Sequence, residues 1–475
     1  MATPIPVNRA AFSLDEIALA TGGALRNAGA GSVRGVITDS RADVAGALFV
    51  ALPGERFDGH DFAPDVAERG AAALLVEREL ALAAPQIVVS STLDALGALA
   101  RLHRRRWGGR IVAVAGSAGK TTTKSAIFAV LRALWPDKVY TAPGNLNNRV
   151  GVPMVLFGLR PEHRSAVVEV GTNQTGEVRA LSEVCEPDLA VLTLIGLEHS
   201  EGLGDLDAIE AEEGSLFESL RAEGAAIANG DDFRALRRLS VAPAATRLSY
   251  GTQRSADYRI VERRSRAEGG SRLVVERAAG RLSIDTALLG LPGALASVAA
   301  LASAELLAGA ALESELVSRA LAGAGVGETG RLAPIELSGH VLVLDDSYNS
   351  NPPSLRSSLA AARELATERG ARLLLVVGEM RELGALSEAA HRELGEELSQ
   401  SGAAALLAVA GDAALFVDPA RARGMHAEFV ADAEAALPHL LDVVRAGDVV
   451  LVKASRGVRI ERVVEGLIRA RGKAA

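Results

Sequence analysis

Cysteine is almost absent from this sequence, since Cys185 is the only one among 475 residues. A single cysteine excludes a disulfide framework and a metal site made of paired cysteines. We interpret Cys185 as a small buried hydrophobic residue rather than as a catalytic nucleophile. Aromatic residues are also scarce, at 3% of the chain, whereas hydrophobic residues as a whole make up 49%. The apolar side chains are therefore mainly aliphatic, which favours an α/β protein with closely packed helices and sheets.

Positive charge is not in excess either, because the formal net charge is −8. This argues against nucleic acid or an anionic membrane as the main partner. We interpret the one basic run, "RLHRRRWGGR" at residues 101–110, as a solvated linker between domains. The N-terminal "MATPIPVNRAAFSLDE" lacks the apolar core of a signal peptide, so we expect a cytoplasmic protein.

The sequence has no uninterrupted hydrophobic run long enough for a confident membrane span. Residues 286–304 are uncharged, but "LGLPGAL" at 289–295 places a proline and two glycines among them. We interpret this stretch as a strand end, a turn and a helix of a soluble domain, and we expect no membrane insertion.

The length predicts about two to four domains. Short β-like runs alternate with helical ones up to about residue 106, and "SLDE" at 13–16 predicts a capped helix start. Strand-like and helix-like segments then alternate in two further blocks, as in mostly parallel sheets. We therefore predict a small α/β N-terminal domain (1–108), a central P-loop mononucleotide-binding domain with a parallel sheet (109–327) and a C-terminal Rossmann-like domain (328–475).

The clearest motif is a glycine loop between a buried strand and a helix, in "IVAVAGSAGKTTTK" at residues 111–124. Backbone N–H groups of such a loop wrap phosphates, with Lys120 reaching the β- and γ-phosphates and Thr121 holding Mg²⁺. The loop is shorter than the usual pattern, which would begin at Val114. The predicted phosphate-binding residues are Gly116, Ser117, Ala118, Gly119, Lys120, Thr121 and Thr122.

Polar residues end other predicted strands at the same sheet edge. Glu169 closes "SAVVEVG" and His199 follows "LAVLTLIG"; both are either Mg²⁺ ligands or ordinary strand-end polar residues. Asp346 in "LDDSYNSNPPS" fits a bond to a ribose hydroxyl, and the same segment also fits a turn and a helix start. "GNLNNRVGVP" at 144–153 holds three asparagines in a loop that suits polar ligand recognition.

One glutamate lies where an apolar residue is expected. In "LDAIEAEEGSLFESL" at 206–220, Glu213 falls inside the apolar stripe of a predicted helix, whereas Glu210 and Glu212 lie to either side of it. A lone carboxylate that faces a core is costly unless a cation, a metal or several donors meet it. The stripe consists of Leu206, Ile209, Leu216, Phe217 and Leu220.

Several motifs occur in the order and spacing of one enzyme family. They are "TDSRADVAGALFVALPGERFDGHDF", "GSAGKTTTK", "GNLNNRVGVP", "EVGTNQTGEV", "DDSYNSNPPS", "VVGEMRELG" and "VLVKASRG". In these motifs, which span nearly the whole chain, the sequence resembles the Mur ligases of peptidoglycan synthesis. The resemblance implies an ATP- and Mg²⁺-dependent ligase that joins D-alanyl-D-alanine to UDP-N-acetylmuramoyl-tripeptide through an acyl phosphate. We expect it to act as a monomer.

The resemblance also implies roles for individual residues. Lys120, His199 and Glu213 would be catalytic, and Mg²⁺ would be held by Thr121, Glu169, His199 and Glu213. Arg331 and Asp346 would bind the ATP nucleotide. The substrate-binding residues would be Thr38, Asp39, Ser40 and Arg41, which hold the uridine nucleotide, together with Asn145, Asn147, Asn148, Asn349 and Asn351.

Two positions depart from the family pattern. Relatives usually carry a carbamylated lysine just before Gly214, where this chain has the shorter Glu213. Either Glu213 supplies the metal-binding carboxylate, with a water bridge or a shifted helix because its side chain is shorter, or it only pairs with a basic residue. Relatives usually also carry a His-Asn pair after "LPG", whose Asn contacts the adenine, where this chain has Leu295 and Ala296.

Three functional interpretations stay open at this point. The first is the D-alanyl-D-alanine-adding ligase, and the second is another Mur-type amino-acid ligase or a folylpolyglutamate synthase. The third is a degenerate, non-catalytic nucleotide-binding relative. "DDSYNSNP" disfavours the second interpretation, and the intact P-loop together with Glu169 and His199 argues against the third.

Glu213 generates a prediction about carbon dioxide. A carbamylated lysine forms reversibly from CO₂, whereas a glutamate is ionised without it. We therefore expect ligase activity to be insensitive to bicarbonate depletion. Glu213→Gln should lose activity and need more Mg²⁺, and Glu213→Lys should regain some activity when bicarbonate is added. Full activity of Glu213→Gln at low Mg²⁺ would show that the carboxylate is only structural.

Overall fold

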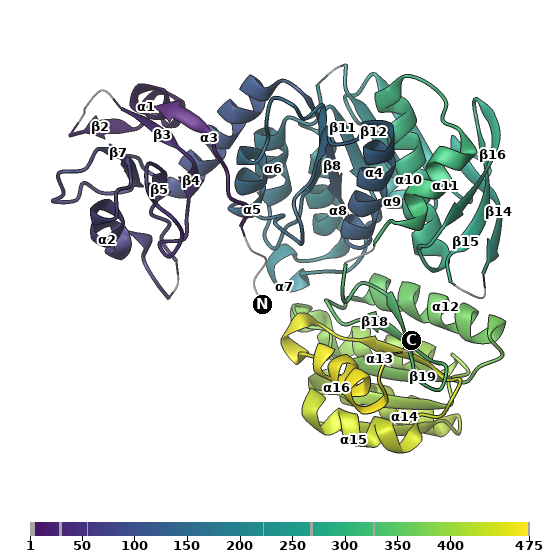
Figure 1. The fold of residues 1–475 in the computed structure, drawn as a ribbon. Helices are drawn as coiled ribbons and strands as arrows, with labels where there is room; N and C mark the ends of the chain where they lie inside the picture. The colour runs from purple at the N-terminus through teal and green to yellow at the C-terminus, as the bar shows by residue number, and fades with distance from the viewer. Residues whose placement is uncertain are drawn as a thin grey trace.

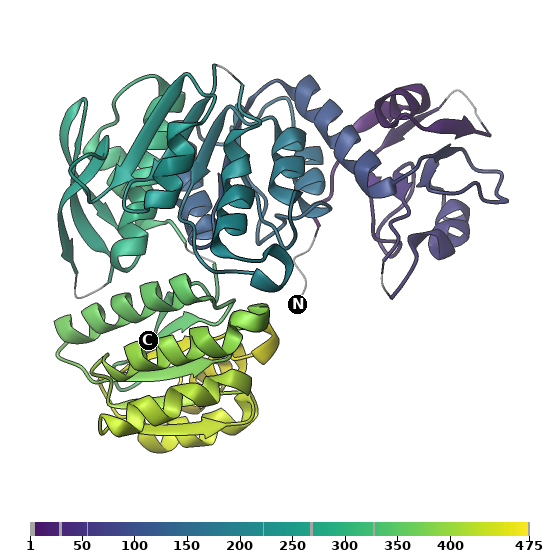
Figure 2. The same cartoon turned by 180° about the vertical axis from the view of Figure 1, so that it is seen from behind.

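The computed structural model of the chain describes residues 5–27, 31–54, 56–221, 223–266, 269–325 and 328–473. Within these residues the strands form a five-stranded, a nine-stranded and a six-stranded sheet, in that order along the chain, and a small β1–β3 ribbon. Figures 1 and 2 show three bodies, with the N-terminal one beside the central one and the C-terminal one below it. The predicted α/β fold is confirmed.

The N-terminal body is a small sheet with the strand order β2-β7-β6-β5-β4. The predicted capping box is present: the Glu16 N–H donates to Ser13 Oγ at 3.2 Å, and the Ser13 N–H donates to the Glu16 carboxylate at 2.8 Å. Its elements are β1 (Ala11–Ser13), α1 (Leu14–Thr21), β2 (Ala24–Arg26), β3 (Ser32–Arg34), β4 (Val36–Ile37), β5 (Leu48–Val50), α2 (Ala63–Glu68), β6 (Ala73–Val76), β7 (Gln86–Val88) and α3 (Thr92–Trp107).

The interpretation of residues 101–110 as a solvated linker is wrong. Most of this run forms the last turns of α3, which packs against two helices of the central body. Arg104 is buried, and its guanidinium donates to the Cys185 carbonyl at 2.9 Å and to the Asp188 carboxylate at 2.7 Å. Cys185 is fully buried as expected, and burial raises the pKa of its thiol to about 12. Acids and carbonyls of the central body thus hold the basic run against it.

The central sheet has the order β16-β15-β14-β13-β12-β11-β8-β10-β9. Pairing is parallel from β9 to β14, whereas β15 and β16 are antiparallel additions that the sequence pattern did not predict. Its elements are β8 (Arg110–Ala115), α4 (Lys120–Leu134), β9 (Val139–Tyr140), α5 (Gly151–Phe157), β10 (Ser165–Glu169), α6 (Glu177–Cys185), β11 (Leu189–Leu192), α7 (Ser200–Leu203), α8 (Leu206–Gly214), β12 (Ala225–Asn229), α9 (Phe233–Ser240), β13 (Thr246–Gly251), β14 (Tyr258–Ser265), β15 (Ser271–Arg277), β16 (Gly280–Thr286), α10 (Gly290–Ala308) and α11 (Ser314–Ala322).

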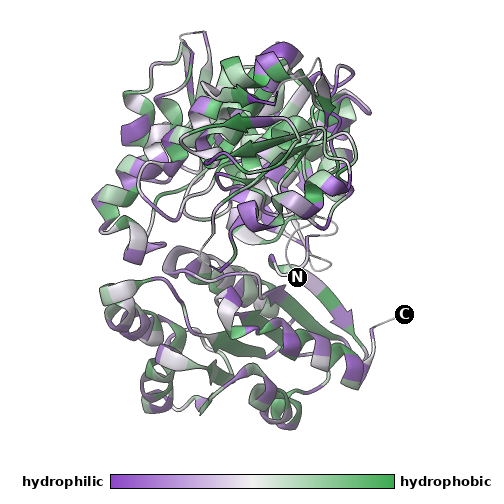
Figure 3. Ribbon diagram, turned by 90° about the vertical axis from the view of Figure 1, so that its left-hand side faces the viewer, coloured by the Kyte–Doolittle hydropathy of each residue, from purple (hydrophilic) through white to green (hydrophobic). Residues whose placement is uncertain are grey.

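Both faces of this sheet are buried. Along β8, Ile111, Ala113 and Ala115 face one core, while Val112 and Val114 face the other. Figure 3 shows the strands of both large sheets as hydrophobic and the outer helix faces as more polar. Parallel strands covered on both faces are continuously apolar, so the first place for polar side chains is the strand end. The fold therefore places polar side chains at the edge of the sheet where the parallel strands end.

The uncharged stretch at 286–304 is a strand end, a turn and a helix, as predicted. Strand β16 ends at Thr286 and α10 begins at Gly290. Helix α10 is the one described helix that is long and apolar enough to cross a membrane, and 72% of its most apolar window is buried inside the structure. Its burial against α4 and the central strands is that of a core helix.

The C-terminal body has the strand order β17-β18-β22-β19-β20-β21. Strands β18, β22, β19 and β20 pair in parallel, as expected for a Rossmann-like domain, and the antiparallel β17 and the parallel β21 extend the sheet at its edges. Its elements are β17 (Ala333–Leu337), β18 (Val341–Asp346), α12 (Pro352–Glu368), β19 (Leu373–Gly378), α13 (Ser387–Ser399), β20 (Ala405–Val409), α14 (Val417–Ala422), β21 (His426–Val430), α15 (Ala433–Val443), β22 (Val449–Lys453) and α16 (Glu461–Arg471).

Arg104 generates a stability prediction. Arg104→Met should lower the free energy of unfolding by about 2–3 kcal/mol, because it removes the donor to the buried Cys185 and Glu186 carbonyls and the ion pair with the partly exposed Asp188. Arg106→Met, two positions further along α3 and more exposed, removes the surface ion pair with Glu16, a 3.4 Å hydrogen bond to the Ala11 carbonyl and a contact with the Phe12 ring, and should cost about 1 kcal/mol or less. Urea denaturation followed by tryptophan fluorescence measures both; equal losses would contradict the role of Arg104.

Candidate active site

The loop between β8 and α4 has the backbone shape that phosphate binding needs. Gly116 and Gly119 have φ angles of +127° and +84°, which are strained for residues with a Cβ atom. A Cβ atom at Gly116 would also lie 2.2 Å from Thr193 Oγ1, just beyond β11. Only glycine fits there. Helix α4 begins at Lys120, so its unpaired N-terminal N–H groups border the loop.

Lys120 extends over this loop among acidic side chains. Its Nζ lies 2.5 Å from the Gly116 carbonyl oxygen, 3.4 Å from Glu198 Oε2 and 4.0 Å from Glu213 Oε1. Burial lowers the pKa of Lys120, but the carboxylates of Glu198, Glu213 and Glu169 outweigh this and raise it. The ammonium group is therefore charged and ready for an anion.

Glu169 lies at the end of β10, beside the start of α4. Its carboxylate accepts from Thr121 Oγ1 at 2.6 Å and from Asn147 Nδ2 at 2.8 Å, and Lys124 Nζ lies 3.8 Å away. Burial raises the pKa of Glu169, but Lys124 and Arg331 lower it overall. The structure thus brings together Thr121, Glu169 and one residue of the asparagine loop.

His199 lies at the other side of the P-loop, in a segment between β11 and α7. Its φ of +45° is unusual for a residue with a side chain. Its Nδ1 lies 2.5 Å from the carboxylate of Glu382, which belongs to the C-terminal body, and its Nε2 lies 4.0 Å from Glu198 Oε2. The hydrogen bond from His199 lowers the pKa of Glu382. His199 therefore lies at a contact between two bodies.

The three glutamates of α8 are all buried, which the helical pattern predicted for Glu213 alone. Glu210 binds Arg234 and Arg237 of α9, and Glu212 accepts from the Gly176 and Val178 N–H groups at the start of α6. Glu213 is fully buried, and its Oε2 accepts from the Gly116 N–H at 2.7 Å.

Glu198 is the second carboxylate beside Lys120. Burial raises the pKa of Glu198 well above its usual range; Lys120 lowers it and Glu213 raises it further. In the described part of the chain, Oε1 of Glu198 and Oε1 of Glu213 are buried without a hydrogen-bond partner. Two acids therefore share one nearby lysine.

The C-terminal body supplies the facing side of the site. Asp346, at the end of β18, accepts from the Leu332 N–H at 3.0 Å and from Lys453 Nζ at 2.6 Å. Its Oδ2 also accepts from the hydroxyl of Ser358. Lys453 Nζ donates in addition to the Asn349 carbonyl at 2.9 Å. The carboxylate of Asp346 is thus held in place by its own domain.

Two further predicted residues of this body are Arg331, which packs within the body, and Asn351, which bonds the central one. The guanidinium of Arg331 stacks over the ring of Tyr348, 4.0 Å from its centroid. Asn351 caps α12 and donates from Nδ2 to the Ser117 carbonyl of the P-loop at 3.0 Å. Asn351 is therefore a structural link between the C-terminal body and the P-loop, a role that the sequence did not suggest.

These groups line one cavity of about 940 Å³ between the central and C-terminal bodies. Most predicted residues lie on its wall: Ser117 to Thr122, Asn145, Asn147, Asn148, Glu169, His199, Arg331, Asp346, Asn349 and Asn351. Gly116 and Glu213 lie behind that wall. Thr38 to Arg41 lie on the N-terminal body and do not line it; there the Arg41 guanidinium lowers the pKa of Asp39 to about 2.

Four residues that contact the predicted ones were not foreseen: Lys124, Glu198, Glu382 and Lys453. Lys124 follows Lys120 by four residues and so shares its helix face. Lys453 ends β22 and so reaches the sheet edge where Asp346 lies. Glu198 adjoins His199 in sequence. No local pattern points to Glu382.

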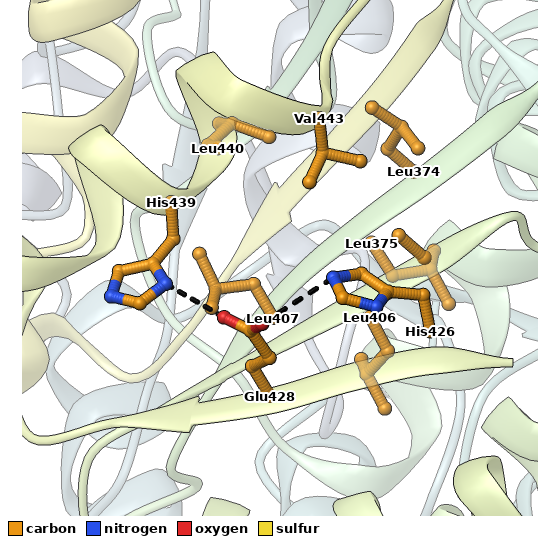
Figure 4. A pocket seen from close by; sticks show the side chains of 10 residues that line it. Leu374, Leu375, Leu406, Leu407, His426, Glu428, His439, Leu440 and Val443 are labelled. Atoms are coloured by element: carbon orange, nitrogen blue, oxygen red, sulfur yellow. Dashed lines mark hydrogen bonds and ion pairs between the residues drawn. The ribbon is translucent and has the colours of Figure 1, made fainter.

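A second cavity lies inside the C-terminal body and is too small for a nucleotide, at about 20 Å³. Figure 4 shows His426 and His439 pointing at opposite sides of Glu428, next to leucines of β19 and β20. The Nδ1 of His439 lies 2.6 Å from the Glu428 carboxylate, and the Nε2 of His426 lies 3.4 Å from it. This cluster is remote from the P-loop.

The large cavity fits a divalent cation that is bound together with phosphates. No three His, Cys, Asp or Glu side chains of the described residues gather as a self-sufficient metal site. Mg²⁺, however, is usually bound by one or two carboxylates together with substrate phosphates and water. Thr121, Glu169 and the unpartnered oxygen of Glu198 are suitable oxygen ligands for such a shared site.

Fold and site together define a three-domain nucleotide-phosphate-binding protein of the P-loop class. Family models match the chain in three places: the Mur ligase family catalytic domain over residues 32–104, the Mur ligase middle domain over 114–304, and the Mur ligase glutamate ligase domain over 330–456. The chain belongs to the Mur ligase family.

Individual relatives are similar over almost the whole chain. The UDP-N-acetylmuramoyl-tripeptide–D-alanyl-D-alanine ligase of Escherichia coli is 36% identical over 434 residues, which are 91% of this chain and 93% of that protein. A crystal structure of MurF from Acinetobacter baumannii has a TM-score of 0.86 at 28% identity and covers 98% of this chain and 100% of that one. MurF ligase from Thermotoga maritima in complex with ADP has a TM-score of 0.79 at 28% identity, over 91% of this chain and 97% of that one.

Gly116 generates a prediction about phosphate binding. Gly116→Ala should weaken ADP binding by at least about tenfold, because the new Cβ atom pushes the loop away from Thr193. Gly176→Ala is the matched control: Gly176 has a similar φ of +90°, but its Cβ would meet nothing within 4 Å. Isothermal titration calorimetry should find the affinity of the control unchanged. Equal weakening in both variants would show that backbone strain alone, and not the close contact, matters.

Proposed function

We propose that this protein is the ATP-dependent ligase that joins D-alanyl-D-alanine to UDP-N-acetylmuramoyl-tripeptide in cytoplasmic peptidoglycan precursor synthesis. The observation that carries the proposal is the P-loop with Lys120, which faces Asp346 and Arg331 of the C-terminal body across one cavity. The names of the relatives support the choice of substrates. We assign UDP-substrate binding to residues 1–108, ATP binding to 109–327 and completion of the ligase site to 328–475.

ATP would lie across the cavity with its phosphates on the P-loop. Lys120 is charged and lies beside the Gly116 carbonyl, from which its Nζ can turn to the β- and γ-phosphates. Thr121, Glu169 and His199 would hold Mg²⁺, which supplies neutralisation of charge during phosphoryl transfer. Asp346 would accept from a ribose hydroxyl, and Arg331 would contact the nucleotide. Glu213 adds negative charge from behind the loop.

The adenine would meet an apolar surface. Ala296, where relatives have the adenine-contacting Asn, is buried within α10 and does not reach the cavity. The cavity wall near the start of α10 is formed by Leu288, Leu289, Pro292 and Gly293. Base recognition in this chain would therefore rest on apolar packing and backbone contacts.

The chemistry would proceed in two steps. A carboxylate oxygen of the tripeptide attacks the γ-phosphorus, the bond to the β-phosphate oxygen breaks, and an acyl phosphate and ADP form. The amine of D-alanyl-D-alanine then attacks the acyl carbon, loses a proton and expels inorganic phosphate. Lys120 would neutralise charge on the transferring group, and the fixed positions of the groups would do most of the rest.

The remaining substrate contacts follow from position. Asn145 and Asn148 line the cavity beside the P-loop, and Asn147 holds Glu169. These asparagines and Asn349 would face the sugar-peptide. Thr38, Asp39, Ser40 and Arg41 would bind the uridine nucleotide on the N-terminal body, apart from the ATP cavity.

The function is tested by release of inorganic phosphate. The parent protein should release phosphate from ATP only when UDP-N-acetylmuramoyl-tripeptide and D-alanyl-D-alanine are both present. Lys120→Ala should abolish this release, by at least about a thousandfold, while its circular dichroism spectrum stays unchanged. Lys138→Ala, an exposed lysine outside the cavity, is the control and should keep full activity. Phosphate release by the parent without either substrate would overturn the proposal.

A further inference from the structure

Glu198 is placed on the cavity wall by the segment between β11 and α7, beside the P-loop. The residue is 3% exposed. One oxygen lies 3.4 Å from Lys120 Nζ, whereas the other is buried and has no hydrogen-bond partner in the described part of the chain. A buried carboxylate oxygen without a donor is costly, so the unused oxygen needs an explanation.

Glu213 lies directly behind, on α8. It is fully buried and does not line the cavity. Its Oε2 is occupied by the Gly116 N–H, and its Oε1 lies 4.0 Å from Lys120 Nζ and has no hydrogen-bond partner. Of the two glutamates, Glu198 is therefore the one that a ligand in the cavity can reach.

The charges near the P-loop do not balance once a nucleotide binds. Glu198 and Glu213 share Lys120, and the other basic group near Glu198 is His199, whose Nε2 is 4.0 Å away. Lys120 is also the group that must neutralise the phosphates. When it turns to them, both carboxylates lose their counter-ion while several negative charges arrive beside them. In the empty site Lys120 balances the charge of Glu198, with which Ser117 and Glu213 also interact. In the loaded site Lys120 no longer balances that charge.

We propose that Glu198 is a cation-binding carboxylate of this site and that Glu213 is its positioning partner behind the P-loop. Mg²⁺ prefers oxygen ligands and is bound by one or two carboxylates together with substrate phosphates. Glu198 lines the cavity and has a buried oxygen without a hydrogen-bond partner in the described part of the chain, whereas Glu213 does not line the cavity. The inference rests on the proposed function, since it assumes that a nucleotide phosphate and a divalent cation bind here together.

The test measures cation binding rather than turnover. Mn²⁺ is titrated into the full-length protein at saturating ADP, and free Mn²⁺ is followed by electron paramagnetic resonance. Glu198→Gln should weaken Mn²⁺ binding by at least about tenfold, and Glu213→Gln should weaken it less, because it acts through Glu198. Glu201→Gln, an exposed glutamate three residues further along, is the matched control and should bind Mn²⁺ like the parent.

A second readout guards against misfolding. Mn²⁺ with ADP should raise the Tm of the parent and of Glu201→Gln, whereas Glu198→Gln should show the rise caused by ADP alone. If Glu198→Gln binds Mn²⁺ as tightly as the parent and keeps the full rise in Tm, Glu198 is only a structural partner of Lys120 and the inference fails.

The two proposals fail separately. Loss of Mn²⁺ affinity in Glu198→Gln, in a protein that releases no phosphate with its two expected substrates, would support the cation site and overturn the function. Phosphate release by the parent protein, together with unchanged Mn²⁺ affinity in Glu198→Gln, would support the function and overturn the cation site.

Discussion

The close approach of two strand ends at Gly116 is the constraint on which the rest of the site depends. The segment after β11 comes so near that no side chain fits, and Glu213 then holds the Gly116 N–H from the other side. With its first residue fixed in this way, the loop can run directly into α4 and present Lys120 and Thr121 at one edge of the sheet. The acids gather around the loop because that edge is the first polar position along buried strands.

The P-loop, the place of Glu169 at the sheet edge and the alternation of strands and helices were predictable, because each has a local signature. The apolar run, the glycines and Lys120 are neighbours in the sequence, so a few adjacent residues are enough to predict the strand, the loop and the helix start. The same holds for Glu169, since the end of a buried parallel strand can lie at only one edge. These features depend on residues that are close together in the sequence.

The contacts between bodies were not predictable in the same way. Asn351 reaches Ser117 across 234 positions of sequence, and Glu382 meets His199 through a loop with no distinctive pattern. The basic end of α3 was misread because its partners, Glu186 and Asp188, lie far along the chain. Helical periodicity singled out Glu213 but could not show that α6 and α9 provide partners for Glu212 and Glu210. Pairings of this kind depend on domain packing, which a one-dimensional pattern does not contain.

The C-terminal body touches the central one both near the phosphate loop and far from it. Near the phosphates, Asn351 binds the P-loop; on the far side, Glu364 of α12 binds Arg263 of β14 at 2.7 Å. Because the two bodies are bonded at both ends of their interface, separating them at one end strains the contact at the other end. Any ligand that binds the docked arrangement more tightly than the undocked one therefore strengthens docking by the same free energy, since such coupling is reciprocal. Arg263 and Glu364 do not line the phosphate site, but through docking they contribute to the affinity for a nucleotide.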